Sequence, residues 1–120
     1  MILQQDINSK PSIKIYHCKQ VNEFSFKALL YGIEEEGIPY ELISCENSDA
    51  ISLSYEACTS SKLGVGFGIS NSEIALHFEK LDKLSPLFKI NFKSKISSIR
   101  SLGTNGARLV KKMPFKEIQI

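Results

Sequence analysis

Four groups of residues in this 120-residue chain could take part in chemistry: a glycine-spaced segment at 64–68, two histidines, three cysteines and three consecutive glutamates. Gly64, Gly66 and Gly68 suggest a phosphate-binding loop, since glycines let backbone N–H groups approach a phosphate. The segment lacks the third glycine of the G-x-G-x-x-G pattern, a following helix start and the Gly-Lys-Ser/Thr of a P-loop. We therefore expect these glycines to let a central strand approach a neighbouring backbone closely.

The histidines and cysteines are the other candidates for a catalytic or metal site. His17 and His77 lie in apolar, strand-like segments, and no G-x-S-x-G nucleophile motif accompanies them, which predicts satisfied histidines of the core or sheet edge. Cys18, Cys45 and Cys58 are odd in number, widely spaced and without a C-x-x-C pair. They are predicted to be ordinary thiols, because neither a disulfide framework nor a zinc site has such spacing. We expect no catalytic residue and no cofactor on this chain alone.

Three consecutive glutamates, Glu34, Glu35 and Glu36, end a predicted helix over residues 23–36. Carboxylates at that end face the negative pole of the helix dipole, which is unfavourable. On a helical wheel Glu35 lies nearly opposite the apolar face that begins at Phe26, so it points away from the chain's own core. It is predicted either to be a solvated glutamate or to offer a carboxylate to something outside the chain. An acid–base pair among the three is a further possibility in principle, but no pocket-forming motif lies beside them.

The elements that must position these residues alternate between strands and helices. Strands are predicted at 12–18, 40–45, 63–69, 73–78 and 86–92, and helices at 23–36, 48–60 and 95–112. Gly37 and Pro39 stop the first helix, and Ser48 is the predicted N-cap of the second. The strand–helix–strand order predicts parallel pairing, and the short turn after residue 69 predicts antiparallel pairing. The predicted fold is a three-layer α/β sandwich with a mixed, mostly parallel sheet of about five strands, flavodoxin-like or anticodon-binding-domain-like.

The helical spacing also predicts which side chains face inward. They are Ile51, Tyr55 and Cys58 in the second helix, and Ile96, Ile99, Ala107, Val110 and Met113 in the last. Gly103 and Gly106 weaken the last helix by about 1 kcal/mol each, which predicts that something packs closely there. We expect a flexible N-terminal tail at 1–10 and a single domain at 11–120.

Composition and charge narrow the class of protein. Apolar residues make up 42% and charged residues 23% of the chain, as in an ordinary globular domain. No apolar run is long enough to cross a membrane, and the first residues do not resemble a signal peptide, so we expect a cytoplasmic protein that does not act at membranes. Residues 1–79 carry 5 Lys/Arg and 11 Asp/Glu, a net −6, and residues 80–120 carry 10 Lys/Arg and 2 Asp/Glu, a net +8. The basic residues are spread out and lack an RNA-binding aromatic signature, so an acidic protein partner or a solvated face is favoured over nucleic acid.

Two longer motifs lie near the two ends of the predicted domain. They are G-I-E-E-E-G-I-P at 32–39 and G-T-N-G-A-R-L-V-K at 103–111, with L-G-V-G at 63–66 and S-P-L-F at 85–88 between them. In this order the motifs resemble the small subunit of the diol/glycerol dehydratase-reactivating factor. The resemblance covers about residues 11–118.

The resemblance implies a non-catalytic, chaperone-like role in propanediol or glycerol utilisation. In that family a large ATPase subunit, which binds Mg²⁺ and ATP or ADP, pairs with the small subunit in an α2β2 heterotetramer. The small subunit is similar in fold to the medium subunit of the B12-dependent dehydratase. It takes that subunit's place against the large subunit of inactivated diol or glycerol dehydratase, so that damaged cobalamin leaves. A carboxylate at the position of Glu35 helps to complete a divalent-metal site of the reactivase large subunit. The expected partner interface comprises Glu34, Glu35, Glu36, Asn105 and Arg108.

Two alternative functions stay open on the sequence. One is the medium, cobalamin-contacting subunit of the dehydratase itself. The other is a stand-alone small-ligand-binding α/β domain, with a pocket where the strand order of the sheet reverses. The sequence also leaves open whether diol or glycerol dehydratase is the client and whether the cytoplasmic assembly lies within a bacterial microcompartment.

Overall fold

The computed structural model describes residues 10–118, and within that range the chain forms five strands, three α-helices and one short 3-10 helix. In chain order these are β1 (Ile13–Cys18), the 3-10 helix η1 (Glu23–Phe26), α2 (Lys27–Glu35), β2 (Tyr40–Cys45), α3 (Ala50–Ser60), β3 (Val65–Ile69), β4 (Glu73–Phe78), β5 (Phe88–Asn91) and α4 (Ile96–Lys111). All eight predicted elements are present, although the first turn of the first helix is 3-10. Of the predicted tail at 1–10, only Lys10 lies among the described residues.

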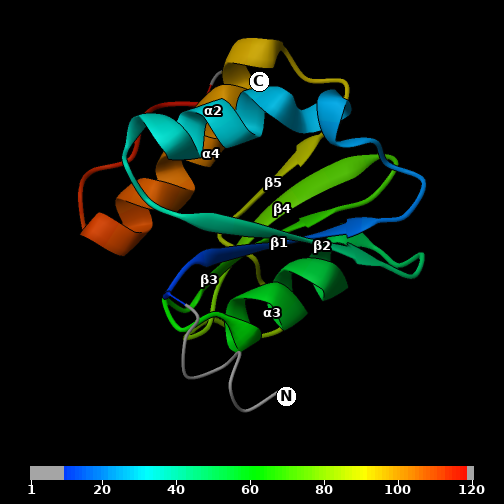
Figure 1. Cartoon of the computed structure of the whole chain (residues 1–120), viewed down its shortest axis with the longest axis horizontal. Coiled ribbons are helices and arrows are strands. Elements are labelled where there is room, and N and C mark those ends of the chain that lie inside the picture. Colours follow the sequence, from blue (N-terminus) through cyan, green and yellow to red (C-terminus); the bar gives the residue numbers. More distant parts are fainter. Residues whose placement is uncertain (1–9, 119–120) are drawn as a thin grey trace.

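The five strands form one mixed sheet in the order β2-β1-β3-β4-β5. β1 pairs in parallel with both β2 and β3, whereas β3–β4 and β4–β5 are antiparallel pairs. Helices α2 and α4 cover one face of the sheet and α3 covers the other (Figure 1). The predicted three-layer α/β sandwich with a mixed sheet is therefore confirmed.

The core lies on both faces of the central strands. All five residues of β3 are buried, and so are the four middle residues of β4. None of the six residues of the edge strand β2 is fully buried. Among the described helices, none is both long and apolar enough to span a lipid bilayer.

Helix α2 ends where the sequence predicts, because Gly37 has a φ of 75°, a conformation that other residues rarely adopt. The Gly37 N–H donates to the carbonyl of Glu34 at 3.0 Å, and the N–H of the C-cap Glu36 donates to the carbonyl of Ile33 at 3.1 Å. The three glutamates therefore occupy the last turn and the cap of α2.

Helix α3 differs from the prediction in its N-cap. The cap is Asp49 in place of Ser48: the Asp49 carboxylate accepts a hydrogen bond from the Ser52 N–H at 3.0 Å. An ionised carboxylate at this end of a helix also interacts favourably with the helix dipole, which a serine does not.

The inward face of α3 is also shifted from the prediction. Cys58 is buried as expected, but Ile51 and Tyr55 are only half-buried, while Ala50 and Ala57 are fully buried. The reason is the closeness of β3. An ideal Cβ on Gly66 would overlap the backbone of residues 57 and 58, and one on Gly68 would overlap the backbone of residues 50 and 54. The prediction of a close backbone approach is confirmed, and Leu53 is the one large side chain among the five buried residues of α3; the other four, Ala50, Ser54, Ala57 and Cys58, are small.

Helix α4 packs on α2 through glycines, as the unfavourable Gly103 suggests. An ideal Cβ on Gly103 would overlap the carbonyl of Leu29, and one on Gly32 would overlap the carbonyl of Arg100. Two inward predictions are wrong at the helix ends. Ile96 is 75% exposed, and Met113, beyond the end of α4, is 40% exposed. The close crossing brings the acidic end of α2 alongside the basic residues of α4.

Candidate functional site

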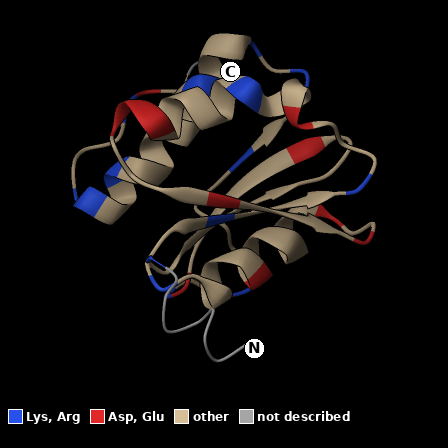
Figure 2. Ribbon diagram, in the orientation of Figure 1, with Lys and Arg blue, Asp and Glu red and all other residues tan. Residues whose placement is uncertain are grey.

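The candidate site is the C-terminal end of α2 with the part of α4 that faces it. Figure 2 shows acidic residues at this end of α2 and basic residues along α4. Glu35 binds Arg100 through both carboxylate oxygens: Nη2 contacts Oε2, and Nε donates to Oε1 at 3.3 Å. The side chains of Glu35 and Arg100 are 46% and 48% exposed. The outward orientation of Glu35 is confirmed, and its partner within the chain is a residue that the sequence analysis did not single out.

Glu36 is held more tightly, between two cations of α4. Lys111 Nζ lies 3.0 Å from its Oε1 and Arg108 Nε lies 3.5 Å from its Oε2, and only 15% of the Glu36 side chain is exposed. Lys111 Nζ also donates to the backbone carbonyl of Glu36 at 3.2 Å. Cations of α4 thus offset the negative charge that gathers at the C-terminal pole of α2.

These contacts keep both carboxylates ionised. The hydrogen bond from Arg100, assisted by its charge, lowers the pKa of Glu35. The hydrogen bond and charge of Lys111, with a smaller contribution from Arg108, lower the pKa of Glu36. Both carboxylates are therefore ionised at neutral pH, and each lies beside a cation of α4.

Glu34 points in a third direction, toward the edge of the sheet. Its carboxylate accepts a hydrogen bond from the Tyr40 hydroxyl at 2.8 Å. Partial burial, together with Glu34, raises the pKa of Tyr40 to about 12, so Tyr40 stays a neutral donor. Glu34 therefore contacts strand β2, whereas Glu35 and Glu36 contact two different positions on α4.

The other two predicted interface residues hold the segment that follows α4. Asn105 is fully buried; its side chain donates to the Lys116 carbonyl at 3.0 Å and accepts from the Lys116 N–H at 2.6 Å. Arg108 Nη1 donates to the carbonyl of Pro114 at 3.3 Å. Arg108 thus lies beside Glu36 at the candidate surface, while Asn105 is buried and holds the backbone of Lys116. A direct contact between either residue and a partner stays a prediction.

Glu35 is a candidate metal ligand at this surface. No cluster of three or more His, Cys, Asp or Glu side chains able to hold a metal exists in the part of the chain that the structure describes. Glu35 is nevertheless an ionised, half-exposed oxygen donor, the type that Mg²⁺ prefers. A role for Glu35 as one ligand of a metal site that another chain completes stays a prediction, since both of its oxygens contact Arg100 here.

An apolar groove of about 360 Å³ is lined by residues of η1, the first half of α2 and the first turns of α4, including Arg100. Phe24, Tyr31 and Ile96 line it, and these side chains are 71%, 44% and 75% exposed. Lys27 lies over the Phe24 ring, 4.6 Å from its centroid. The sequence analysis missed this surface, because helical spacing assigned Ile96 to the core.

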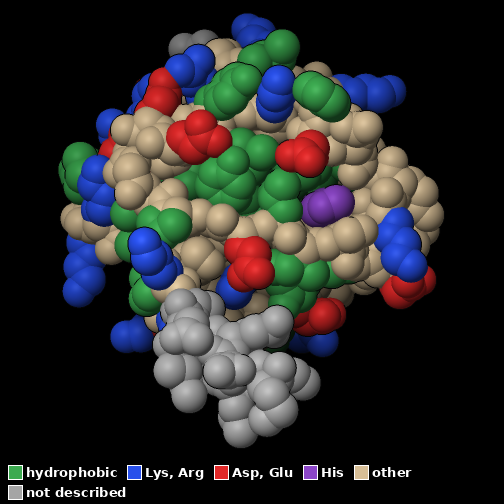
Figure 3. Space-filling model, in the orientation of Figure 1, with side chains coloured by type: hydrophobic (Ala, Val, Ile, Leu, Met, Phe, Trp, Pro, Cys, Tyr) green, Lys and Arg blue, Asp and Glu red, His purple; other side chains and the backbone are tan. Residues whose placement is uncertain are grey.

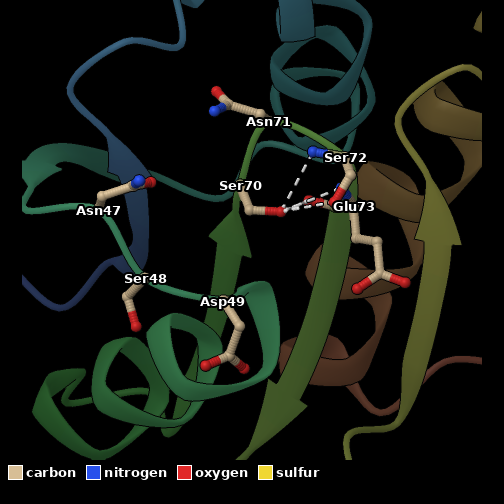
Figure 4. Close-up of a pocket in the computed structure, with 7 residues that line it drawn as sticks. All are labelled: Asn47, Ser48, Asp49, Ser70, Asn71, Ser72 and Glu73. Atoms are coloured by element: carbon tan, nitrogen blue, oxygen red, sulfur yellow. Dashed lines mark hydrogen bonds between the residues drawn. The ribbon is translucent and has the colours of Figure 1, made fainter.

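A second, polar cavity opens at the carboxyl ends of β2 and β3 (Figure 4). This edge is where a stand-alone ligand-binding domain would bind its ligand. Two of its polar side chains are already engaged. Asp49 caps α3, and the Ser70 hydroxyl accepts from the N–H groups of Ser72 at 3.3 Å and Glu73 at 3.1 Å. The cavity therefore gives little support to that alternative.

The histidines lie where the sequence predicts. His77 is fully buried, its Nε2 lies 3.0 Å from the Lys83 carbonyl, and its Nδ1 accepts from the Phe78 N–H at 3.0 Å. His17 is half-buried, and its ring packs against Phe26. The three cysteines are free thiols. Burial raises the pKa of Cys45, and raises that of Cys58 to about 11, which disfavours the nucleophilic thiolate in both.

Comparison with known proteins adds independent information. The model of the dehydratase medium subunit family matches residues 10–116. The propanediol dehydratase-reactivating factor small subunit of Citrobacter freundii is 39% identical over 89 residues, which cover 74% of this chain and 77% of that protein. The diol dehydratase-reactivating factor small subunit of Klebsiella michiganensis is 33% identical over 93 residues, which cover 78% and 74%.

Two solved structures share the fold over the whole of their matching chains. One is a diol dehydratase-reactivating factor complexed with ADP and Mg²⁺, with a TM-score of 0.87, 32% identity, and coverage of 91% of this chain and 100% of that one. The other is a glycerol dehydratase reactivase, with a TM-score of 0.87, 30% identity, and coverage of 92% and 100%.

Proposed function

Because this chain belongs to the dehydratase medium subunit family, and within it resembles the small subunits of dehydratase-reactivating factors, we propose that it is the non-catalytic small subunit of such a factor. Its task is to help restore diol or glycerol dehydratase that has become inactive. The single observation that carries the proposal is the match, at a TM-score of 0.87, to the complete length of a chain from each of two reactivases.

In the proposed mechanism the chain acts by binding and exchange. It takes the place of the medium subunit against the large subunit of an inactivated dehydratase, so that damaged cobalamin is released. ATP hydrolysis occurs on the large subunit of the reactivating factor, with which this chain forms an α2β2 assembly. The presence of ADP and Mg²⁺ in a related structure supports a nucleotide-bearing partner.

Within that assembly we assign the acidic end of α2 to the interface with the large subunit. Glu35 provides a carboxylate to a divalent cation of that subunit, where the cation supplies charge that holds the two chains together. The ionised state and exposure of Glu35 support this role. Both of its oxygens contact Arg100 in the free chain, so Arg100 has to release or share at least one of them on assembly. Glu34, Glu36 and Arg108 extend the same surface, and Asn105 supports it from below.

A second candidate is the dehydratase medium subunit, which the matching family model describes. The two functions make different demands on this chain. A medium subunit is expected to help bind cobalamin, whereas a reactivase subunit is expected to bind an ATPase.

Reconstitution distinguishes the two. The purified chain and the large subunit of the reactivating factor are added, with ATP and Mg²⁺, to dehydratase inactivated by glycerol or cyanocobalamin. We expect activity to return only when both proteins and the nucleotide are present. Full recovery with either protein alone would contradict the exchange mechanism, and cobalamin that stays with this chain through gel filtration would favour the medium subunit.

A further inference from the structure

The outer edge of β2 presents a row of backbone groups that are not hydrogen-bonded among the described residues. In the parallel β1–β2 pair the N–H groups of Ile13 and Lys19 donate to the carbonyls of Pro39 and Cys45, both at 3.0 Å. In a parallel ladder this register directs the N–H and C=O groups of alternate residues, here Glu41, Ile43 and Cys45, toward β1. The remaining three, Tyr40, Leu42 and Ser44, therefore point their N–H and C=O groups outward.

The two edges of the sheet are protected to different degrees. β5 is only four residues long and carries Lys89, and short length and lysine are common protections against strand addition. β2 is six residues long and has no proline or bulge, and its one charged residue, Glu41, is ion-paired with Lys14. β2 is therefore suited to accept a further strand.

The side chains of β2 are also incompletely covered. Tyr40, Leu42, Ile43 and Cys45 are all half-buried. Figure 3 shows this side of the molecule, where hydrophobic side chains gather in the middle of the face between α2 and α3. An added strand would cover apolar surface on both faces of the sheet while it pairs with the backbone.

Charge indicates which kind of strand fits. Glu23 and Glu34 lie close enough to Tyr40 to contribute to its raised pKa, and neither is ion-paired among the described residues. In Figure 3 acidic side chains border the hydrophobic area. If a second copy paired antiparallel about Leu42, the two acidic borders would face each other, which is unfavourable. A basic segment would meet opposite charge.

We propose that β2 is a docking edge for an extended segment of the reactivase large subunit, with lysine or arginine on the side facing α2 and apolar residues between them. This inference rests on the proposed function. It names a surface outside the Glu35 site but continuous with it, since the Tyr40 hydroxyl binds Glu34.

Amide hydrogen exchange of the full chain, alone and saturated with the purified large subunit, tests the proposal at single residues. The N–H groups of Tyr40, Leu42 and Ser44 should exchange quickly in the free chain and at least about tenfold more slowly in the complex. Those of Glu41, Ile43 and Cys45, which pair with β1, should be protected in both states. Unchanged exchange at residues 40, 42 and 44 in the saturated complex would overturn the docking edge and leave the proposed function intact.

A pair of variants at Ser44 provides a second test. Ser44→Pro removes an outward N–H while the ladder with β1 is kept, because an edge strand tolerates proline on its open side. Ser44→Thr keeps the N–H and is the matched control. We expect the dissociation constant for the large subunit to rise about tenfold with proline and to stay unchanged with threonine.

Two further results would also overturn the proposal. If the wild-type chain does not bind the large subunit at all, the proposed function is wrong, and the docking edge is wrong with it. If light scattering shows that the isolated chain dimerises, with the same three amides protected as concentration rises, the occupant is a second copy of this chain.

Discussion

At the scale of single residues, the contact between Glu35 and Arg100 makes a testable distinction between stability and binding. Glu35→Gln removes one charge from an exposed ion pair, and such pairs contribute little to folding. The variant should therefore melt at nearly the same temperature as the wild type. If Glu35 is a ligand to a cation of the large subunit, the dissociation constant should rise about 30-fold or more in Mg²⁺ buffer, since a buried interfacial charge loses its partner.

The matched control for this variant is Glu73→Gln. Glu73 is also partly exposed and ion-paired, to Lys89 at 3.4 Å, but it lies in β4, away from α2. Its replacement should change neither the melting temperature nor the binding. Equal affinities for Glu35→Gln and wild type, measured by titration with and without Mg²⁺, would mean that Glu35 is an ordinary surface glutamate.

Part of this site could be predicted from the sequence. The wheel position of Glu35 predicts its exposure, because helical geometry is local. Its pairing with Arg100 joins residues 65 positions apart and depends on how two helices cross, which no local pattern records. Asn105 shows the same limit: its spacing in a motif suggests importance, but its burial against Lys116 follows from the path of the chain after α4.

At the scale of the helices, the close crossing of α2 and α4 predicts that replacing Gly103 by alanine destabilises the fold. Gly103→Ala should destabilise the fold by about 1–3 kcal/mol, although alanine is the better helix former by about 1 kcal/mol, because the added Cβ would overlap the Leu29 carbonyl. Urea unfolding measures the change.

Ser101→Ala, two residues away in the same helix, is the control and should change the free energy of unfolding by no more than about 0.5 kcal/mol. If Gly103→Ala were as stable as the wild type, the two helices would have room to move apart, and the close crossing would not be required for folding.

The elements themselves were largely predictable, and the errors have a common cause. Strand and helix positions follow from apolar periodicity and from strong stop signals such as Gly37 and Pro39. The inward face of α3 was misplaced because periodicity gives weight to large apolar residues, such as Ile51 and Tyr55. The glycines of β3 instead bring the sheet close to the backbone of α3, where Ala50 and Ala57 are fully buried. Ile96 was assigned inward for the same reason, although the first turn of α4 extends beyond the core.

At the scale of the whole molecule, the acidic N-terminal part and the basic C-terminal part of the chain meet where α2 and α4 cross. Glu35 and Glu36 have pKa values below the ordinary 4.5, so they bind protons less readily when folded than when unfolded. Their stabilising contribution is complete above about pH 4.5 and is lost as the pH falls through their folded-state values.

The isolated chain should therefore lose stability on acidification between about pH 5 and pH 3, measured as a falling urea midpoint. In the double variant Glu35→Gln/Glu36→Gln the decline should be shallower. Some decline should remain, because backbone hydrogen bonds at the start of α3 also lower the pKa of Asp49. Glu46→Gln, a change at a side chain that is 86% exposed, is the control and should follow the wild type. A steeper decline in the double variant than in the wild type would contradict this linkage.

The glycine contacts between α2 and α4 also have a mechanical consequence. At Gly32 and Gly103 the backbones of the two helices lie directly against each other. We therefore expect the two helices to move together, as one unit, relative to the sheet. A displacement of Glu35 on binding a partner would then also move the backbone of Lys116, which Asn105 holds.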